Sequence, residues 1–189
     1  MKRKYSTVLA ALTVIGWFVS AQAQAQTLTL DPASSIVRFQ GTSGRHGFEG
    51  QTRDMRSSLE VDLKEQKLLS AADLSIPIEG FKTGNDARDH AMQHMFEMKR
   101  YPEILFHVAV IAPAEEKGTY DLEGTVSIHG VTQPVRIKAQ AVITEETVRV
   151  KGEYRMNVED FGMKPPSMLG VFRVRKDVLV SFDTTWIVS

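Results

Sequence analysis

From residue 26 onward, apolar and polar side chains alternate with a period of two over several long segments, which is the pattern of half-buried β-strands. In the clearest of them, Leu59 and Val61 fall in one phase while Ser58 and Glu60 fall in the other. Short polar connections separate the segments, so consecutive strands are expected to pair antiparallel, because parallel pairs need long crossovers. The expected strands are residues 36–42, 55–63, 69–78, 104–110, 120–128, 135–141, 148–158 and 178–188.

One segment, residues 85–100, breaks this rhythm and predicts a helix. It opens with Asn85, contains helix-forming residues, carries basic residues at its end and is followed by Tyr101 and Pro102. These are the start and stop signals of a helix. The apolar residues expected on one face of this helix are Met92, Met95, Phe96 and Met98.

A set of about eight long strands fits either a closed barrel or a two-sheet sandwich. The hairpin-length connections favour an up-and-down barrel, and closure removes the exposed strand edges that promote aggregation. The fold class predicted from the pattern is therefore all-β. A barrel of about eight strands is just wide enough to be filled by side chains or to hold one small ligand. The alternation alone leaves both interiors open.

The N-terminal residues predict export. A short basic stretch precedes an uncharged apolar run of 13 residues, 7–19, and small residues then offer cleavage sites after Ala23 or Ala25. This order is typical of a secretory signal peptide. The run is shorter than the ~20 residues that a membrane-spanning helix needs. We therefore expect a cleaved signal peptide over residues 1–25 and one domain over residues 26–189, located in the periplasm or secreted.

The charge and the cysteine content exclude several classes of protein. The chain of 189 residues has 23 basic and 23 acidic side chains, and without the signal peptide 20 basic side chains face 23 acidic ones. A mildly acidic domain is a poor candidate for binding nucleic acid, which requires clustered positive charge. The chain has no cysteine. Disulfides, a cysteine nucleophile and thiolate metal sites are therefore excluded.

Motifs of catalysis and of cofactor binding are absent from the sequence, which has no nucleophile elbow, phosphate-binding loop or dinucleotide fingerprint. His90 and His94 could share a metal on the helix, but the local sequence places no third ligand, so two solvated histidines are the favoured interpretation. Glu159 and Asp160 are neighbours at a strand end and point apart, which gives acid–base catalysis little support. His129 is expected in a turn. We expect no enzyme, no bound metal and no cofactor other than a lipid ligand.

Several motifs resemble the YceI-like lipid/polyisoprenoid-binding proteins. Residues 78–89 (IEGFKTGNDARD), 101–106 (YPEILF) and 124–135 (GTVSIHGVTQPV) resemble the central signature of that family. The motif DFGMKPP at 160–166 resembles a late loop of one branch, and HGFEG at 46–50 resembles an early element. These blocks occur in order over nearly the whole of the expected mature chain.

The resemblance implies an elongated, eight-stranded antiparallel, lipocalin-like barrel with one short helix at its mouth. It also implies a non-catalytic periplasmic or secreted protein, often a homodimer, that carries an isoprenoid lipid or the tail of a quinone. Two alternatives stay open: a stress-induced structural or interaction protein whose barrel is filled, and an enzyme acting on an isoprenoid lipid. The candidate ligand-binding residues are Phe39, Phe48, Phe81, Met92, Met95, Phe96, Phe106, Met156, Phe161 and Phe182.

Overall fold

The computed structural model describes residues 25–62, 65, 67–70, 72–165, 167–168 and 172–188, and the described chain is built mainly of strands. One α-helix, α1 (Asp86–Met95), and three short 3-10 turns, η1 (Pro32–Ser34), η2 (Ile78–Gly80) and η3 (Val158–Phe161), lie between them. The all-β prediction is confirmed. The strands are β1 (Ala25–Leu30), β2 (Ile36–Ser43), β3 (His46–Thr52), β4 (Arg56–Asp62), β5 (Lys67–Ser70), β6 (Asp73–Pro77), β7 (Glu103–Pro113), β8 (Thr119–Ile128), β9 (Val131–Ile143), β10 (Thr147–Asn157), β11 (Ser167–Met168), β12 (Phe172–Arg173) and β13 (Asp177–Val188).

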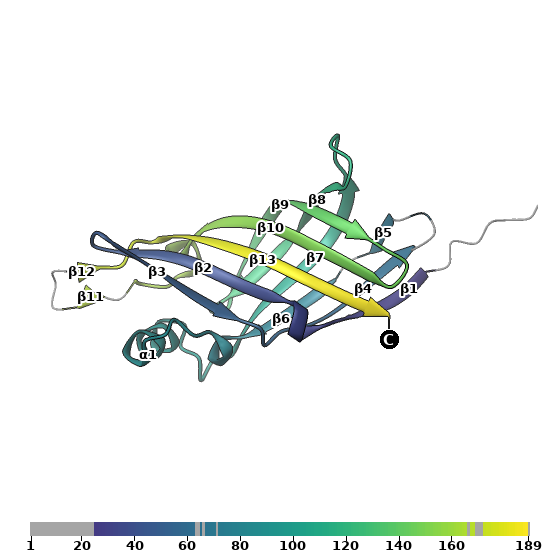
Figure 1. Cartoon of the computed structure of the whole chain (residues 1–189). Helices are drawn as coiled ribbons and strands as arrows, with labels where there is room; N and C mark the ends of the chain where they lie inside the picture. Colours follow the sequence, from purple (N-terminus) through teal and green to yellow (C-terminus); the bar gives the residue numbers. More distant parts are fainter. Residues whose placement is uncertain are drawn as a thin grey trace, which may run out of the picture.

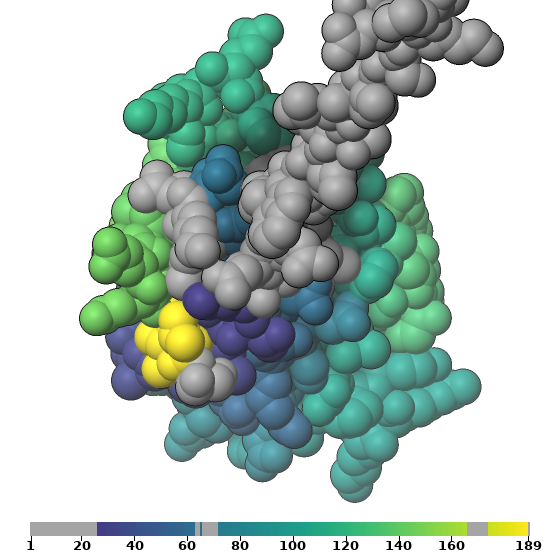
Figure 2. All heavy atoms as spheres, turned by 90° about the vertical axis from the view of Figure 1, so that its right-hand side faces the viewer, coloured from purple at the N-terminus to yellow at the C-terminus, as the bar shows by residue number. Residues whose placement is uncertain are grey.

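Eight of the described strands close into an elongated antiparallel barrel (Figure 1). Their order is β1-β4-β6-β7-β8-β9-β10-β13, and β13 pairs back onto β1 through residues such as Trp186 and Leu30. Figure 2 looks onto this end of the molecule, where the yellow end of β13 lies beside the purple atoms of β1. Closure leaves these eight strands without a free edge. The predicted eight-stranded barrel is confirmed. The set of strands differs, because β1, which the pattern did not predict, belongs to the closed barrel, whereas β2, which it did predict, lies outside it. The expected strand 69–78 is divided into β5 and β6.

The opposite end of the barrel carries a hairpin and the helix. β13 pairs with β2 over Leu179–Asp183, and β2 pairs in turn with β3. Beyond this hairpin, β3 forms an isolated bridge between Gln51 and Lys82 in the segment that leads to α1. Figure 1 shows α1 beside β3, at the end away from the C-terminus. The helix therefore borders the mouth of the barrel, as the sequence predicted.

The inside of the barrel is filled by the apolar phase of the strands. Leu59 and Val61 are buried, while Ser58 and Glu60 between them are exposed, so the predicted alternation is confirmed on β4. The main core lies between the strands of the closed barrel. A second cluster beneath α1 and η3 consists of Val126, Ile128, Val135, Val158, Phe161 and Met163.

The helix ends earlier than residue 100, where the sequence predicted its end. Its last residue is Met95, and Glu97 adopts a left-handed backbone with φ 48°. The N–H groups of Glu97 and Met98 donate to the carbonyls of His94 and Gln93, each at 3.0 Å, which is the bonding pattern of a Schellman cap. The cap, rather than Pro102, stops the helix. Among the described residues, no helix combines the length and the apolar composition needed to cross a membrane.

The apolar phase of β7 also differs from the prediction at one position. Val108 is buried, but Val110, expected in the same phase, is 49% exposed. The pairing with β8 shifts register between these two residues, which is a β-bulge at Ala109. Because one extra residue reverses the side-chain phase of a strand, Val110 faces outward and Ile111 packs against the core.

Candidate ligand-binding site

An apolar cavity of about 120 Å³ lies at the end of the barrel that α1 borders. This volume equals that of about four water molecules in the liquid, and it has room for part of a long apolar chain. Its walls come from α1, from η3 and from strands β2, β3, β7, β8, β10 and β13. The described lining residues are Phe39, Phe48, Phe81, Thr83, Arg88, Ala91, Met92, Met95, Phe96, Ile104, Ile128, Met156, Val158, Pro165, Val174, Arg175, Val178 and Val180.

Three phenylalanine rings form one wall of this cavity. Phe39 packs edge-on against Phe48 at 6.2 Å and against Phe81 at 5.7 Å between ring centres. In the β2–β3 register, Phe39 pairs with Gly50 and Phe48 pairs with Gly41. A Cβ atom on either glycine would overlap the ring opposite. The glycines of the HGFEG motif and of β2 therefore let the rings lie across the hairpin.

The helical wall is positioned by a polar network at the start of α1. Asn85 caps the helix by accepting the N–H of Arg88 at 2.9 Å. The buried carboxylate of Asp89 accepts the N–H and the hydroxyl of Thr83, at 2.9 and 2.5 Å. These bonds tie the segment after Phe81 to the helix. They explain why the TGNDARD sequence places Met92 on the cavity side.

The end of the helical wall is held by His129, in the turn between β8 and β9. Its Nδ1 lies 3.2 Å from the carbonyl oxygen of Phe161, and its Nε2 lies 3.2 Å from a carboxylate oxygen of Glu97. The second contact lacks the direction of a hydrogen bond. The ring of Tyr101 packs against the imidazole at 4.8 Å. The sequence predicted that His129 lies in a turn, and its left-handed backbone, with φ 53°, agrees with this. The sequence did not predict that His129 contacts the end of the helix.

Seven of the ten predicted ligand-binding residues line the cavity, and three lie elsewhere. Phe106 and Phe182 pack against the main core, and Phe161 is 1% exposed within the second cluster. The sequence reasoning missed Arg88 and Arg175, because it searched the apolar phases for candidates. The seven lining residues are Phe39, Phe48, Phe81, Met92, Met95, Phe96 and Met156.

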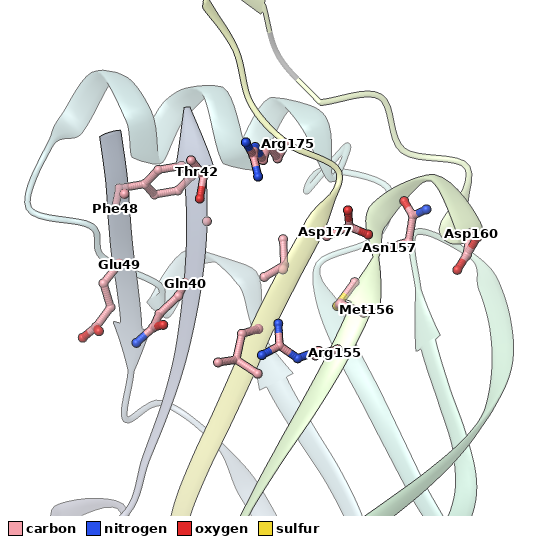
Figure 3. A pocket seen from close by; sticks show the side chains of 14 residues that line it. Gln40, Thr42, Phe48, Glu49, Arg155, Met156, Asn157, Asp160, Arg175 and Asp177 are labelled. Carbon is pink, nitrogen blue, oxygen red and sulfur yellow. The ribbon is translucent and has the colours of Figure 1, made fainter. Parts of the chain in front are cut away.

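A second hollow, a polar groove of about 980 Å³, lies on the outside of β2, β3, β10 and β13 (Figure 3). Figure 3 shows Gln40, Glu49 and Arg155 along its walls. The groove and the cavity adjoin, since four residues line both of them. These shared residues are Phe48, Met156, Arg175 and Val178.

The titratable groups outside the cavity lining include Tyr154 on β10 and two histidines on α1. Burial raises the pKa of the Tyr154 phenol, and the negative charge of Asp160 adds to the rise, so this phenol stays protonated at neutral pH. His90 and His94 are exposed on α1. In the described part of the chain, no group of three or more potential metal ligands comes together.

The closed antiparallel barrel with an apolar cavity at one end defines a lipocalin-like β-barrel protein, of the kind that can enclose a small ligand. The chain belongs to the YceI-like domain family, which it matches over residues 28–186. This confirms the family that the motifs indicated. Among curated sequences, it is similar to a UPF0312 protein of Pseudomonas savastanoi pv. phaseolicola, with 27% identity over an alignment of 189 positions that covers 93% of this chain and 95% of that protein.

Solved structures share the fold at low sequence identity. BcnA of Burkholderia cenocepacia superposes with a TM-score of 0.72 at 19% identity, covering 82% of this chain and 98% of that chain. A polyisoprenoid binding domain from Saccharophagus degradans, implicated in plant cell wall breakdown, gives a TM-score of 0.69 at 17% identity, covering 87% and 99%. The YCEI protein of Campylobacter jejuni gives 0.62 at 16% identity, covering 97% of each chain.

Proposed function

We propose that this protein binds the isoprenoid chain of a polyprenyl lipid or of a quinone and carries or sequesters it without chemical change. The observation that supports this most is the apolar cavity beside α1, which phenylalanine and methionine side chains line. The shared fold with the polyisoprenoid binding domain of Saccharophagus degradans points the same way.

The energetics favour such a ligand. Taking an isoprenoid chain out of water stabilises the complex by roughly 0.8 kcal/mol for each buried methylene-sized group. A chain longer than the cavity has to displace side chains, and Met92 and Met95 suit this because unbranched methionine side chains adopt many shapes. In this proposal the end of the chain enters the cavity and the two methionines move to extend it.

The proposed place of action is the periplasm or the external medium. An isoprenoid lipid cannot cross an aqueous compartment alone, and a barrel that buries it would make transfer possible. The predicted signal peptide supports this location, and the family match begins at residue 28, after both cleavage sites. A homodimer, which the family resemblance implied, is part of the same proposal.

The decisive experiment is native mass spectrometry of the full chain, expressed with its signal peptide and purified after export. We expect a mass above that of the polypeptide and an isoprenoid compound in the organic extract. Met95→Gln should lower the lipid content per protein, because a polar amide then lines the cavity. Met98→Gln is the matched control, since Met98 follows the same helix but does not line the cavity.

The alternative of a filled barrel has support of its own, because the cavity is small and the main core beyond it is packed. A structural or interaction protein would show only the polypeptide mass after export. It would also show equal melting temperatures before and after organic extraction. That pair of results would contradict the lipid-binding proposal.

A further inference from the structure

The charged side chains that line the apolar cavity are all of one sign. Of its described lining residues, only Arg88 and Arg175 carry a charge, and both charges are positive. The one other polar lining side chain, Thr83, already donates its hydroxyl to Asp89. All 23 aspartate and glutamate residues of the chain fall within the described residues, and none of them lines the cavity.

The guanidinium of Arg88 and the backbone of Arg175 are each held by a contact with β2 or β3. The guanidinium of Arg88 lies over the ring of Phe48, 4.9 Å from its centre, which covers one face and leaves the N–H edges available. The backbone N–H of Arg175 donates to the carbonyl of Thr42 at 2.8 Å. Within the described structure neither guanidinium forms an ion pair, whereas Arg149 and Arg136 on the barrel wall do.

The two arginines lie where the polar head group of a bound lipid would lie. Arg175 lines both the cavity and the outer groove, so it lies where the apolar interior meets solvent, and Figure 3 shows it on the side of the groove next to Phe48. Arg88 lies on Phe48, which also lines both hollows. A ligand whose chain fills the cavity would have its polar end beside these two side chains.

We infer that the ligand is an amphiphile whose head group is an oxyanion, phosphate or carboxylate, bound between Arg88 and Arg175. This inference rests on the function proposed above and narrows it. The planar guanidinium donates paired hydrogen bonds that match the oxygens of a phosphate or a carboxylate. A neutral quinone or alcohol would fill the cavity equally well but would form no charge-assisted hydrogen bond with either guanidinium.

Three probes that share one isoprenoid chain and differ in their head group test this inference: geranylgeranyl phosphate, geranylgeranoic acid and geranylgeraniol. Their dissociation constants would be measured by calorimetry on the delipidated mature protein. We expect at least one anion to bind about tenfold or more tighter than the alcohol, because charge-assisted hydrogen bonds are the stronger kind. The preference should weaken as ionic strength rises. Whichever anion binds tighter identifies the head group as phosphate or carboxylate.

Variants at the two arginines test whether these side chains cause the preference for the anionic probes. Arg175→Gln, at an exposed position, and Arg88→Lys, which keeps the charge but not the planar fork, should each reduce the preference for the anion over geranylgeraniol. Arg155→Gln is the control, because Arg155 lines the outer groove and not the cavity. Equal binding of all three probes would overturn the head-group inference while the lipid-binding function stands. Binding of none would contradict that function itself.

Discussion

Gly124 on β8 faces His107 on β7 so closely that a Cβ atom on the glycine would overlap the carbonyl oxygen of the histidine. This approach lies directly beside the β-bulge at Ala109, where the two strands change register. The glycine therefore permits the bulge that turns Val110 outward and Ile111 inward. The contact is with backbone, which cannot move aside as a flexible side chain can.

Gly124→Ala should destabilise the protein by about 1–3 kcal/mol or more, because the added methyl group overpacks a site walled by backbone. Urea unfolding measures the loss. Gly47→Ala is the matched control, since a Cβ atom there meets only the Gly41 carbonyl oxygen at 4.0 Å. Equal stability of the two variants would contradict the steric explanation.

His129→Asn should cost about 1–2 kcal/mol, because the imidazole contacts with Phe161 and Glu97 are lost while asparagine still tolerates the left-handed backbone. His129→Ala should cost about 1 kcal/mol more, since alanine is strained at positive φ. Hydrogen exchange should also speed up at the end of α1 in both variants. If both variants exchange at the wild-type rates at Phe96 and Glu97, His129 does not hold the end of the helix.

Asp183 makes stability depend on pH. Its two carboxylate oxygens accept hydrogen bonds from Arg149, each at 2.7 Å, and these bonds lower the pKa of Asp183 despite partial burial. Because the pKa of Asp183 is lower in the folded state, its contribution to stability is fully present when the pH is above about 3.9, the pKa of an aspartate in the unfolded chain. This contribution is lost as the pH falls through the pKa of the folded state.

Asp183→Asn should therefore cost about 1 kcal/mol at neutral pH and almost nothing near pH ~2. Unfolding by urea at both pH values gives the comparison. Glu153→Gln is the control, because Glu153 also faces outward on this wall but forms no ion pair in the described structure. A loss for Asp183→Asn that is the same at both pH values would contradict the assignment.

Phe106→Ala should lower the stability of the delipidated protein by about 3–5 kcal/mol, because the ring packs against both hydrophobic clusters and its removal opens a cavity. Met95→Gln should cost much less, since Met95 borders a space that is already open. Denaturant titration of both variants tests this. A small loss for Phe106→Ala would indicate that the ring faces the ligand space rather than the core.

N-terminal sequencing of exported protein should find Gln24 or Gln26 as the first residue, since cleavage after Ala23 or Ala25 follows a small-x-small tripeptide. Exported protein that still begins with Met1 would exclude the signal peptide.

The sequence alone determined the features that repeat along the chain. Period-two alternation is local, so it predicted most of the strands, although not β1 or β3, and, with hairpin-length connections, their antiparallel order and the closed barrel. Of the seven predicted residues that line the cavity, all but Phe48 and Phe81 were assigned to the inside by the phase of a predicted strand or helix. Phe48 and Phe81 lie in motifs that resemble the family. The single helix was also visible, although its cap at Glu97 was not, since glutamate rarely adopts a left-handed backbone.

The tertiary structure decided what depends on contacts between distant segments. One extra residue on β7 reversed the side of Val110, and no pattern within the strand marks that bulge. Arg88 and Arg175 meet at one cavity because α1 folds beside β3 and the start of β13. His129 holds the end of α1 for a similar reason. The local pattern does not show which distant residues these polar side chains will meet, because the three residues lie outside the strands, so their contacts become fixed only when the barrel closes.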